Sequence, residues 1–184
     1  MSSRFERLDS EPLYDGGFIS LQRMRFRHED GEIVERDIVV HTGAVGVVTL
    51  DEQDQLWFVR QPREAVGVPD LLEIPAGKLD MEGESPLEGA QRELREEAGV
   101  EAATWREIGR AHISNSITDE AATLYLATGL RPVPQALESS EADLTVDWVA
   151  FDEVMAMVLD GRVTDAMSII ALQRVALERT GAGG

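Results

Sequence analysis

The chain has 184 residues, 43% of them hydrophobic, and a formal net charge of −18 at pH 7. That length suits one domain with a real core, and that hydrophobic fraction argues against disorder. The negative charge repels phosphate backbones and anionic membranes, so we expect neither a nucleic-acid partner nor a membrane partner. No cysteine is present, which excludes disulfides, thiolate metal sites and a cysteine nucleophile.

The first 40 residues are predicted to form an arm that ends in a β-hairpin, ahead of a domain over residues 41–184. Residues 17–28 (GFISLQRMRFRH) alternate apolar and polar side chains, as in a strand. Glu29-Asp30-Gly31 favour a turn, and residues 32–41 are predicted to form the second strand of the hairpin. The opening residues are charged where a signal peptide needs an apolar core, and no apolar run reaches membrane-spanning length. We therefore expect a cytoplasmic location.

Three strands are predicted next. Gly43–Leu50 (GAVGVVTL) is almost continuously apolar, which indicates a buried strand. Leu56–Gln61 is expected to pair back with it after a polar turn. Residues 63–70 are predicted to be a loop that leads into a short strand over 71–75 (LLEIP).

The clearest helix signal in the chain begins at Ser85. Ser85 and Glu88 have the spacing of a capping box, and Pro86 stands at the first helical position. Apolar residues follow at helical spacing, and Gly99 stands where a C-terminal cap belongs. The apolar stripe consists of Leu87, Ala90, Leu94 and Ala98.

Strands return in the second half of the chain, followed by two helices. Asp152 is predicted to cap a helix that ends by Gly161, and residues 165–179 are predicted to form an amphipathic final helix. Strands interspersed with a few helices indicate an α/β sandwich of mixed sheets. The predicted strands cover residues 105–113, 122–130 and 144–151.

The helix over 86–98 concentrates negative charge on one side. At about 100° per residue, Glu93, Glu96 and Glu97 share one face with Arg92 at its edge. Like charges four residues apart destabilise a helix by a few tenths of a kcal/mol, and a hard divalent cation would offset that repulsion. The alternative is an ordinary solvated helix face.

These residues resemble the Nudix box. Arg92 to Val100 fits its Arg-Glu-apolar-any-Glu-Glu-any-Gly-apolar half, and Glu84 stands eight residues before Arg92, as the box requires. Gly77 departs by one position, which a one-residue insertion at 81–83 would explain without disturbing the helix. The resemblance implies a Nudix-type α/β/α sandwich and hydrolysis of nucleoside diphosphates linked to another group.

The resemblance also implies roles for the box residues. Arg92 would orient the carboxylates, with Glu96 and Arg92 counted among the catalytic residues, and Glu84 would lock the preceding loop onto the helix. The cofactor would be Mg²⁺ or Mn²⁺, which draws charge off the diphosphate. Its ligands would be Glu93, Glu97, the neighbouring Glu96 and the backbone carbonyl of Ala76.

Segments outside the box resemble the ADP-ribose pyrophosphatase branch of that family. They include RDIVVHTGAVGVV, LLEIPAGKLD, TDAMSIIALQRVAL and VRQPREAV, in which Pro62 replaces the usual aromatic residue. By the resemblance, Arg63 would contact the adenine or phosphate side of the substrate. The alternative for Arg63 is a surface salt bridge.

Two loops carry further expected site residues. In this branch a loop glutamate before the last strand acts on the attacking water, which points to Glu141, with Glu138 as the alternate, unless that acidic loop is simply solvated. Ser114 opens a segment that borders substrate in the branch. There Asn115 and Ser116 replace the usual Pro-Gly, so a different nucleoside diphosphate sugar is an open alternative.

The arm resembles those that exchange across a homodimer in this branch, and Arg36 would then contact substrate from the arm. An ordinary hairpin packed on its own subunit is the alternative. Together these features predict metal-dependent hydrolysis of ADP-ribose to AMP and ribose 5-phosphate. The alternatives are the same chemistry on another nucleotide sugar or a dinucleoside polyphosphate, and a non-catalytic nucleotide-sugar sensor.

Overall fold

The chain folds into two units. A computed structural model describes residues 4–16, 19–137 and 143–181. One unit holds residues 1–42 with 112–120, and the other holds residues 43–111 with 121–184. In the described part of the chain, no helix combines the length and the apolarity that crossing a bilayer needs.

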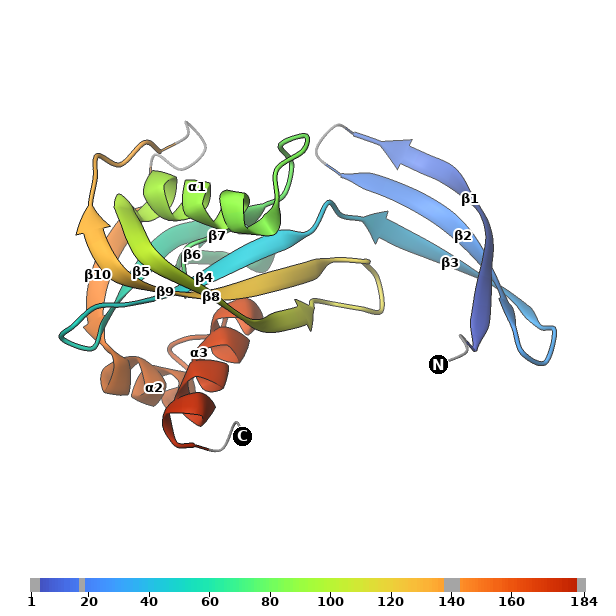
Figure 1. Cartoon of the computed structure of the whole chain (residues 1–184). Helices are drawn as coiled ribbons and strands as arrows, with labels where there is room; N and C mark the ends of the chain where they lie inside the picture. The colour runs from blue at the N-terminus through green and yellow to red at the C-terminus, as the bar shows by residue number, and fades with distance from the viewer. Residues whose placement is uncertain (1–3, 17–18, 138–142, 182–184) are drawn as a thin grey trace. The chain divides into compact units, whose positions relative to one another are not determined.

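The first unit is built on a three-stranded antiparallel sheet of β1 (Phe5–Asp15), β2 (Ser20–His28) and β3 (Ile33–Val40). The predicted hairpin is present as β2 and β3 (Figure 1), and Ser20 pairs with Val40 in its register. The sequence analysis did not anticipate β1, whose acidic residues and Pro12 weaken the strand signal. Pro12 is tolerated there because β1 lies at the edge of the sheet.

The two faces of this sheet differ because side chains alternate along each strand. One face carries a row of ion pairs between β2 arginines and acidic residues of its neighbours, whereas Met24 on the other face is only 4% exposed. Water and salt screen exposed pairs of this kind, so they keep the face charged more than they stabilise it. The pairs are Arg23–Asp37, Arg25–Asp9 and Arg27–Glu6.

The second unit contains two sheets. In the four-stranded sheet, ordered β7-β4-β9-β8, β4 pairs parallel with β9 and antiparallel with β7. The other sheet, ordered β10-β5-β6, is antiparallel, so the expected pairing of Leu56–Gln61 with Gly43–Leu50 is wrong: these strands belong to different sheets. The predicted mixture of strand directions is thus confirmed. The strands are β4 (Ala44–Leu50), β5 (Gln55–Arg63), β6 (Val68–Glu73), β7 (Ala76–Lys78), β8 (Val100–His112), β9 (Ala121–Pro132) and β10 (Thr145–Ala150).

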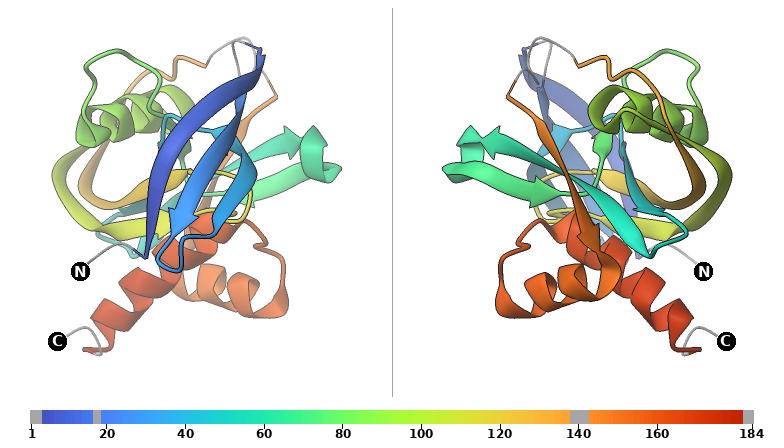
Figure 2. Two further views of the ribbon diagram at one scale, coloured as in Figure 1. Left: turned by 90° about the vertical axis from the view of Figure 1, so that its right-hand side faces the viewer. Right: turned by 90° about the vertical axis from the view of Figure 1, so that its left-hand side faces the viewer.

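Helices cover both sides of these sheets. Figures 1 and 2 show α1 (Pro86–Ala98) on one side, and α2 (Phe151–Asp160) and α3 (Ala166–Arg179) together on the other. This arrangement confirms the predicted α/β/α sandwich. A short 3-10 helix over Glu64–Val66 joins β5 to β6, so most of the predicted loop over 63–70 is strand or 3-10 helix.

The predicted cap of α2 is wrong. The N-cap is Ala150, and Asp152 lies in the first turn. β10 runs directly into the helix, and Phe151 is buried at its first position. The backbone N–H of Phe151 donates to the carbonyl of Asp54 at 2.9 Å, so a neighbouring turn satisfies a donor that a capping side chain would otherwise serve.

The apolar stripe of α1 packs into the core of the second unit. Ala90 and Leu94 are fully buried and Ala98 nearly so, against Val45 and Trp57 of the sheets. Leu87 is the exception, since it lies in the first turn and is 36% exposed. Deleting a buried leucine side chain costs about 3–5 kcal/mol, so Leu94 fixes which face of α1 turns away from this core.

Candidate active site

Both ends of α1 are fixed as its sequence predicts. The Ser85 hydroxyl accepts from the Glu88 backbone N–H at 3.3 Å, and the Glu88 side chain accepts from the Ser85 backbone N–H at 2.8 Å. Gly99 closes the helix in the left-handed conformation, φ 62°. A helix held at both ends and by Leu94 presents its acidic side chains in a defined direction.

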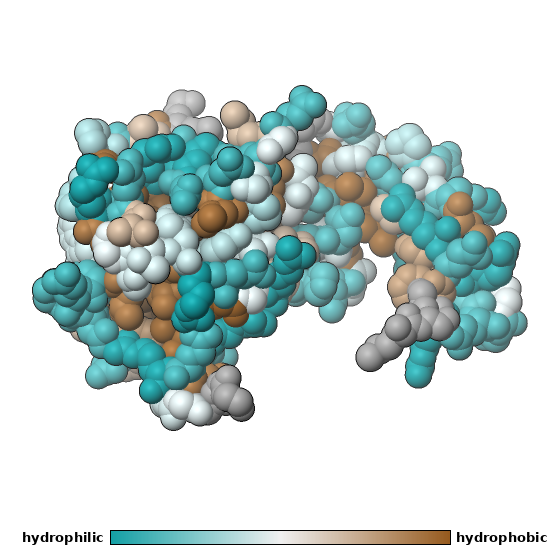
Figure 3. Space-filling view, in the orientation of Figure 1, coloured by the Kyte–Doolittle hydropathy of each residue, from teal (hydrophilic) through white to brown (hydrophobic). Residues whose placement is uncertain are grey.

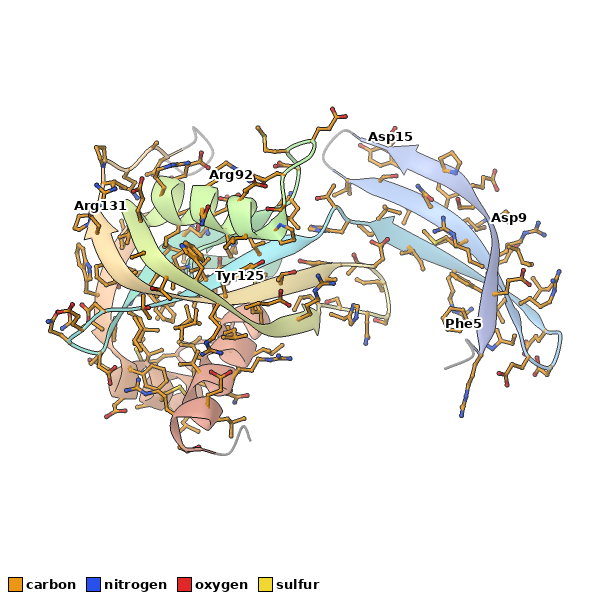
Figure 4. All side chains as sticks on the ribbon, in the orientation of Figure 1. Phe5, Asp9, Asp15, Arg92, Tyr125 and Arg131 are labelled. Atoms are coloured by element: carbon orange, nitrogen blue, oxygen red, sulfur yellow. The ribbon has the colours of Figure 1, made fainter. Side chains whose placement is uncertain are left out.

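Arg92, labelled on α1 in Figure 4, forms the centre of a cluster of carboxylates. Its guanidinium donates to Glu84 through Nε at 2.9 Å and through Nη2 at 3.1 Å, and Nη2 also reaches the carbonyl of Lys78 at 3.3 Å. Nη1 donates to Glu93 at 2.7 Å and to Glu96 at 3.0 Å. These contacts, first among them the hydrogen bond to Glu84, raise the pKa of Arg92.

Glu93 lies against the backbone of Gly77. A Cβ atom placed on Gly77 would lie 2.0 Å from Cδ of Glu93, so only glycine leaves room for this carboxylate. Gly89 makes similar room on the helix, because a Cβ there would lie 3.1 Å from an oxygen of Glu84. Two glycines therefore allow the close packing of carboxylates around Arg92.

Glu97 is the most deeply buried acidic residue of the helix, with 2% of the residue exposed. Its Oε2 accepts from the backbone N–H of Ala76 at 2.8 Å. Ala76 begins β7, next to Gly77. The structure thus brings together three of the predicted metal ligands, Ala76, Glu93 and Glu97. Glu96, the fourth, joins them through Arg92 and is less buried.

The donors in this cluster suit a hard divalent cation. Carboxylate and backbone carbonyl oxygens are the ligands that Mg²⁺ prefers. As arranged in the described residues, no three acidic or histidine side chains already form a metal cage. The guanidinium of Arg92 lies between Glu93 and Glu96 and balances part of their charge. Hydrophilic side chains cover much of the surface around α1 (Figure 3).

Arg63, the predicted substrate contact in the second unit, ends β5 and forms a two-pronged ion pair with Glu73. Nε donates to Oε1 at 2.8 Å and Nη2 to Oε2 at 2.6 Å. That hydrogen bonding is the main cause that raises the pKa of Arg63, and the charges of Glu97 and Asp165 raise it further. Of the α1 carboxylates, Glu97 therefore acts electrostatically on Arg63.

Of the remaining predicted site residues, two belong to the first unit and two lie outside the described residues. Arg36 on β3 and Ser114 both belong to the first unit; Arg36 is exposed and donates to the neighbouring carbonyl of Glu35 at 2.8 Å. Ser114 is also exposed, and it starts a turn with φ 50°. The predicted bases, Glu141 and Glu138, lie outside the described residues.

The segment that follows Ser114 has a structural role within the first unit. Asp119 accepts from the backbone N–H of His41 at 2.8 Å, and the carbonyl of Ile117 accepts from the N–H of Val39 at 2.8 Å. These bonds tie residues 117–119 to the end of β3. Residues 117–119 therefore support backbone pairing at the end of β3.

Two features near α1 were missed by the sequence analysis. Glu73 is a buried carboxylate inside an apolar strand, and that isolated charge beside Leu71-Leu72 was a usable signal. The other is the segment after β9. Its Gln135 side chain donates to the Glu97 carbonyl, and the Ala136 N–H donates to the Glu96 carbonyl at 3.4 Å. No local pattern announced that contact.

Comparison with known proteins agrees with this geometry. The sequence model of the NUDIX domain matches residues 40–170. An ADP-ribose pyrophosphatase of Mycobacterium tuberculosis is 39% identical over 179 residues, which cover 96% of this chain and 86% of that protein. An ADP-ribose pyrophosphatase of Bacillus subtilis is 31% identical over 169 residues, covering 91% of this chain and 90% of that protein.

Two further likenesses extend over nearly the whole chain. A methanol dehydrogenase activator of Bacillus methanolicus is 32% identical over 182 residues, which cover 97% of each chain. The crystal structure of an ADP compounds hydrolase superposes with a TM-score of 0.80 at 20% identity, covering 98% of this chain and 97% of that one. The structural likeness establishes the fold, and the sequence likenesses establish the family.

Proposed function

The chain belongs to the NUDIX family and is a pyrophosphohydrolase, and from that premise we propose that it hydrolyses ADP-ribose to AMP and ribose 5-phosphate with Mg²⁺. The observation that carries the proposal is the burial of Glu93 and Glu97 against the backbone of Ala76-Gly77. Two buried carboxylates at one loop are costly unless they are paired or hold a cation. Two relatives named as ADP-ribose pyrophosphatases support the choice of substrate.

In the proposed reaction, a water oxygen bonds to one phosphorus of the diphosphate and the bridging P–O bond breaks. One phosphate stays on adenosine and the other on ribose. Glu93, Glu97 and the backbone of Ala76 would hold the cation, with Glu96 beside them. When bound, the cation would supply positive charge that offsets the charge of the diphosphate.

The protein's own groups have distinct tasks in this proposal. Arg92 holds Glu93 and Glu96 in place through Nη1, and its bonds to Glu84 lock the preceding loop to α1. Glu141, or Glu138 in its place, would accept the proton of the attacking water. Glu93 and Glu97 are buried, and a low local dielectric strengthens their interactions with the cation and with Arg92.

Another nucleoside diphosphate sugar is the second candidate substrate, and Asn115-Ser116 is the observation that favours it. The test is a panel of ADP-ribose, other nucleotide sugars and dinucleoside polyphosphates, with phosphate release coupled to alkaline phosphatase. Each reaction is run with Mg²⁺ and with EDTA. We expect metal-dependent activity that is highest on ADP-ribose, and preference for another compound would overturn the proposed substrate while keeping the family chemistry.

We also propose that the working form is a homodimer joined through the first unit. Exposed apolar side chains on and beside β1 support this, among them Phe5, Leu13 and Tyr14, which are 53%, 40% and 57% exposed. Light scattering on the full chain should give twice the mass of one chain, and Leu13→Asp with Tyr14→Asp should halve it. A wild-type monomer with full activity would contradict the proposal.

A further inference from the structure

Glu73 carries a negative charge inside the second unit, where charge is costly. Only 5% of the residue is exposed, and its carboxylate accepts three side-chain hydrogen bonds: two from Arg63, at 2.8 and 2.6 Å, and one from Gln61 at 3.2 Å. An apolar pair of similar size would serve stability equally well, so a buried ion pair is weak evidence for a structural purpose. The location of the pair is therefore informative.

The end of β6 is a rigid support for Glu73. The next residue, Ile74, donates its backbone N–H to Ser168 Oγ at 2.9 Å, and that hydroxyl donates to Asp165 at 2.7 Å. Ser168 is fully buried in the first turn of α3. Two residues beyond Ile74 lies Ala76, whose N–H holds Glu97. The strand that carries Glu73 thus leads directly into the proposed metal loop.

The ion pair with Glu73 leaves Nη1 of the Arg63 guanidinium available to bind a ligand. Nε and Nη2 face Glu73, and within the described residues Nη1 makes no hydrogen bond. The charges of Glu97, on α1, and of Asp165 also act on the guanidinium. A planar fork pinned on one edge presents its remaining N–H groups in a fixed direction, which suits recognition of a phosphate oxygen.

We propose that Glu73, assisted by Gln61, is a positioning residue that orients Arg63 so that Nη1 binds a diphosphate oxygen of the substrate. Glu73 acts through Arg63 and does not touch the substrate. The inference rests on the proposed function, in that the ligand is a nucleoside diphosphate. It adds a reason for the buried charge, because a guanidinium already oriented loses less rotational freedom when it binds an anion.

The test measures binding of α,β-methylene-ADP in the presence of Mg²⁺ by calorimetry, because that probe carries the diphosphate but resists hydrolysis. Glu73→Gln should weaken its affinity about tenfold, and Arg63→Gln at least as much. The double variant should bind like Arg63→Gln alone, since Glu73 has no other route to the ligand. With ADP-ribose, Glu73→Gln should raise KM more than it lowers kcat.

A second ion pair, whose arginine lies on β5 as Arg63 does, provides the control. Arg60 Nε donates to Asp147 at 2.5 Å, and Asp147 is 40% exposed. Asp147→Asn removes a charge of the same sign from an arginine three residues away and should leave probe affinity within about twofold of wild type. If Glu73→Gln does not fold, Arg63→Lys replaces it: the ammonium keeps the charge but cannot form the fork, so binding should still weaken about tenfold.

Three results would overturn the inference: wild-type affinity in Glu73→Gln, losses that simply add in the double variant, or a wild-type chain that does not bind the probe. Failure of the proposed substrate looks different. In that case the wild type binds the probe and Glu73→Gln weakens it, but ADP-ribose is not consumed.

Discussion

The carboxylate of Glu93 fills the space that a side chain on Gly77 would need, with Cδ 2.0 Å from the position of the missing Cβ. The glycine is thus required by tertiary packing. Between Gly77 and Glu84 the loop turns at residues 81–84, where Gly83 has φ 81° and the Glu84 N–H donates to the Met81 carbonyl at 3.1 Å. This turn lies between Gly77 and the capped start of α1, where an insertion of one residue would leave the helix geometry unchanged.

Replacing Gly77 with alanine should therefore displace Glu93. We expect kcat to fall about tenfold to a hundredfold, because a displacement of about 1 Å at a reacting site can have an effect of that size. Gly83→Ala is the control, since its Cβ would meet nothing within 4 Å. That change strains a left-handed residue by about 1–2 kcal/mol but should leave kcat unchanged well below the unfolding temperature. Equal activity in the two variants would contradict the role given to Gly77.

Glu97→Gln separates the chemistry of Glu97 from its structural contact. The amide oxygen of glutamine can still accept from the Ala76 N–H, so the fold should be retained with little change in the free energy of unfolding. Turnover should fall at least about a hundredfold, because the charge that would hold the cation is lost. Glu101→Gln on β8 is the matched control. If Glu97→Gln kept activity within a few-fold of wild type, the proposal that Glu97 binds the cation would be wrong.

Arg92→Lys tests the centre of the cluster. Lysine keeps the charge but cannot donate along the Nε–Nη2 edge to Glu84 and through Nη1 to Glu93 at the same time. We expect a loss of about 1–3 kcal/mol in the free energy of unfolding, together with a lower kcat. Urea unfolding measures the first quantity. Arg95→Lys, on the exposed side of the same helix, should change neither quantity, and an equal effect there would argue against a special role for Arg92.

The capping box makes stability depend on pH. Hydrogen bonds from the Ser85 hydroxyl, and then from its backbone N–H, lower the pKa of Glu88 below its usual range. The stabilising contribution is therefore present above the pKa of the unfolded chain, about 4.3, and is lost as pH falls through the lower folded value. Glu88→Gln keeps the hydrogen bonds but does not titrate, so its stability should fall less on acidification. Urea unfolding midpoints measured between pH 3 and pH 6, in steps of about half a pH unit, test this, with Glu82→Gln as the control. If the midpoint of Glu88→Gln falls with pH as steeply as that of the wild type, the prediction is contradicted.

α1 could be predicted from local sequence signals. Its surroundings could not, because they depend on contacts between residues that are distant in the sequence. The capping box at Ser85 and the glycine at 99 are read within one helix, and both ends were predicted correctly. Helical periodicity placed Glu93 and Glu97 on one face of α1, but did not show that this face is buried against Ala76-Gly77. That burial comes from β7, which lies on the far side of a loop.

The missed features have a common physical cause. Asp152 looked like a cap because capping is usually local, but Phe151 and the carbonyl of Asp54 fix that end of α2 through tertiary contacts. Arg63 gave no sign of its partner because Glu73 meets it only when β5 and β6 pair. Residues that act through strand pairing are thus harder to predict than those that act within one helix.

The central claim is metal-dependent cleavage of ADP-ribose at the diphosphate, and phosphorus NMR of a reaction with the wild-type chain tests it most directly. The account predicts equal amounts of AMP and ribose 5-phosphate with Mg²⁺, and unchanged ADP-ribose with EDTA. Intact ADP-ribose with Mg²⁺ present, products that retain the diphosphate, or equal rates with and without the metal would contradict it.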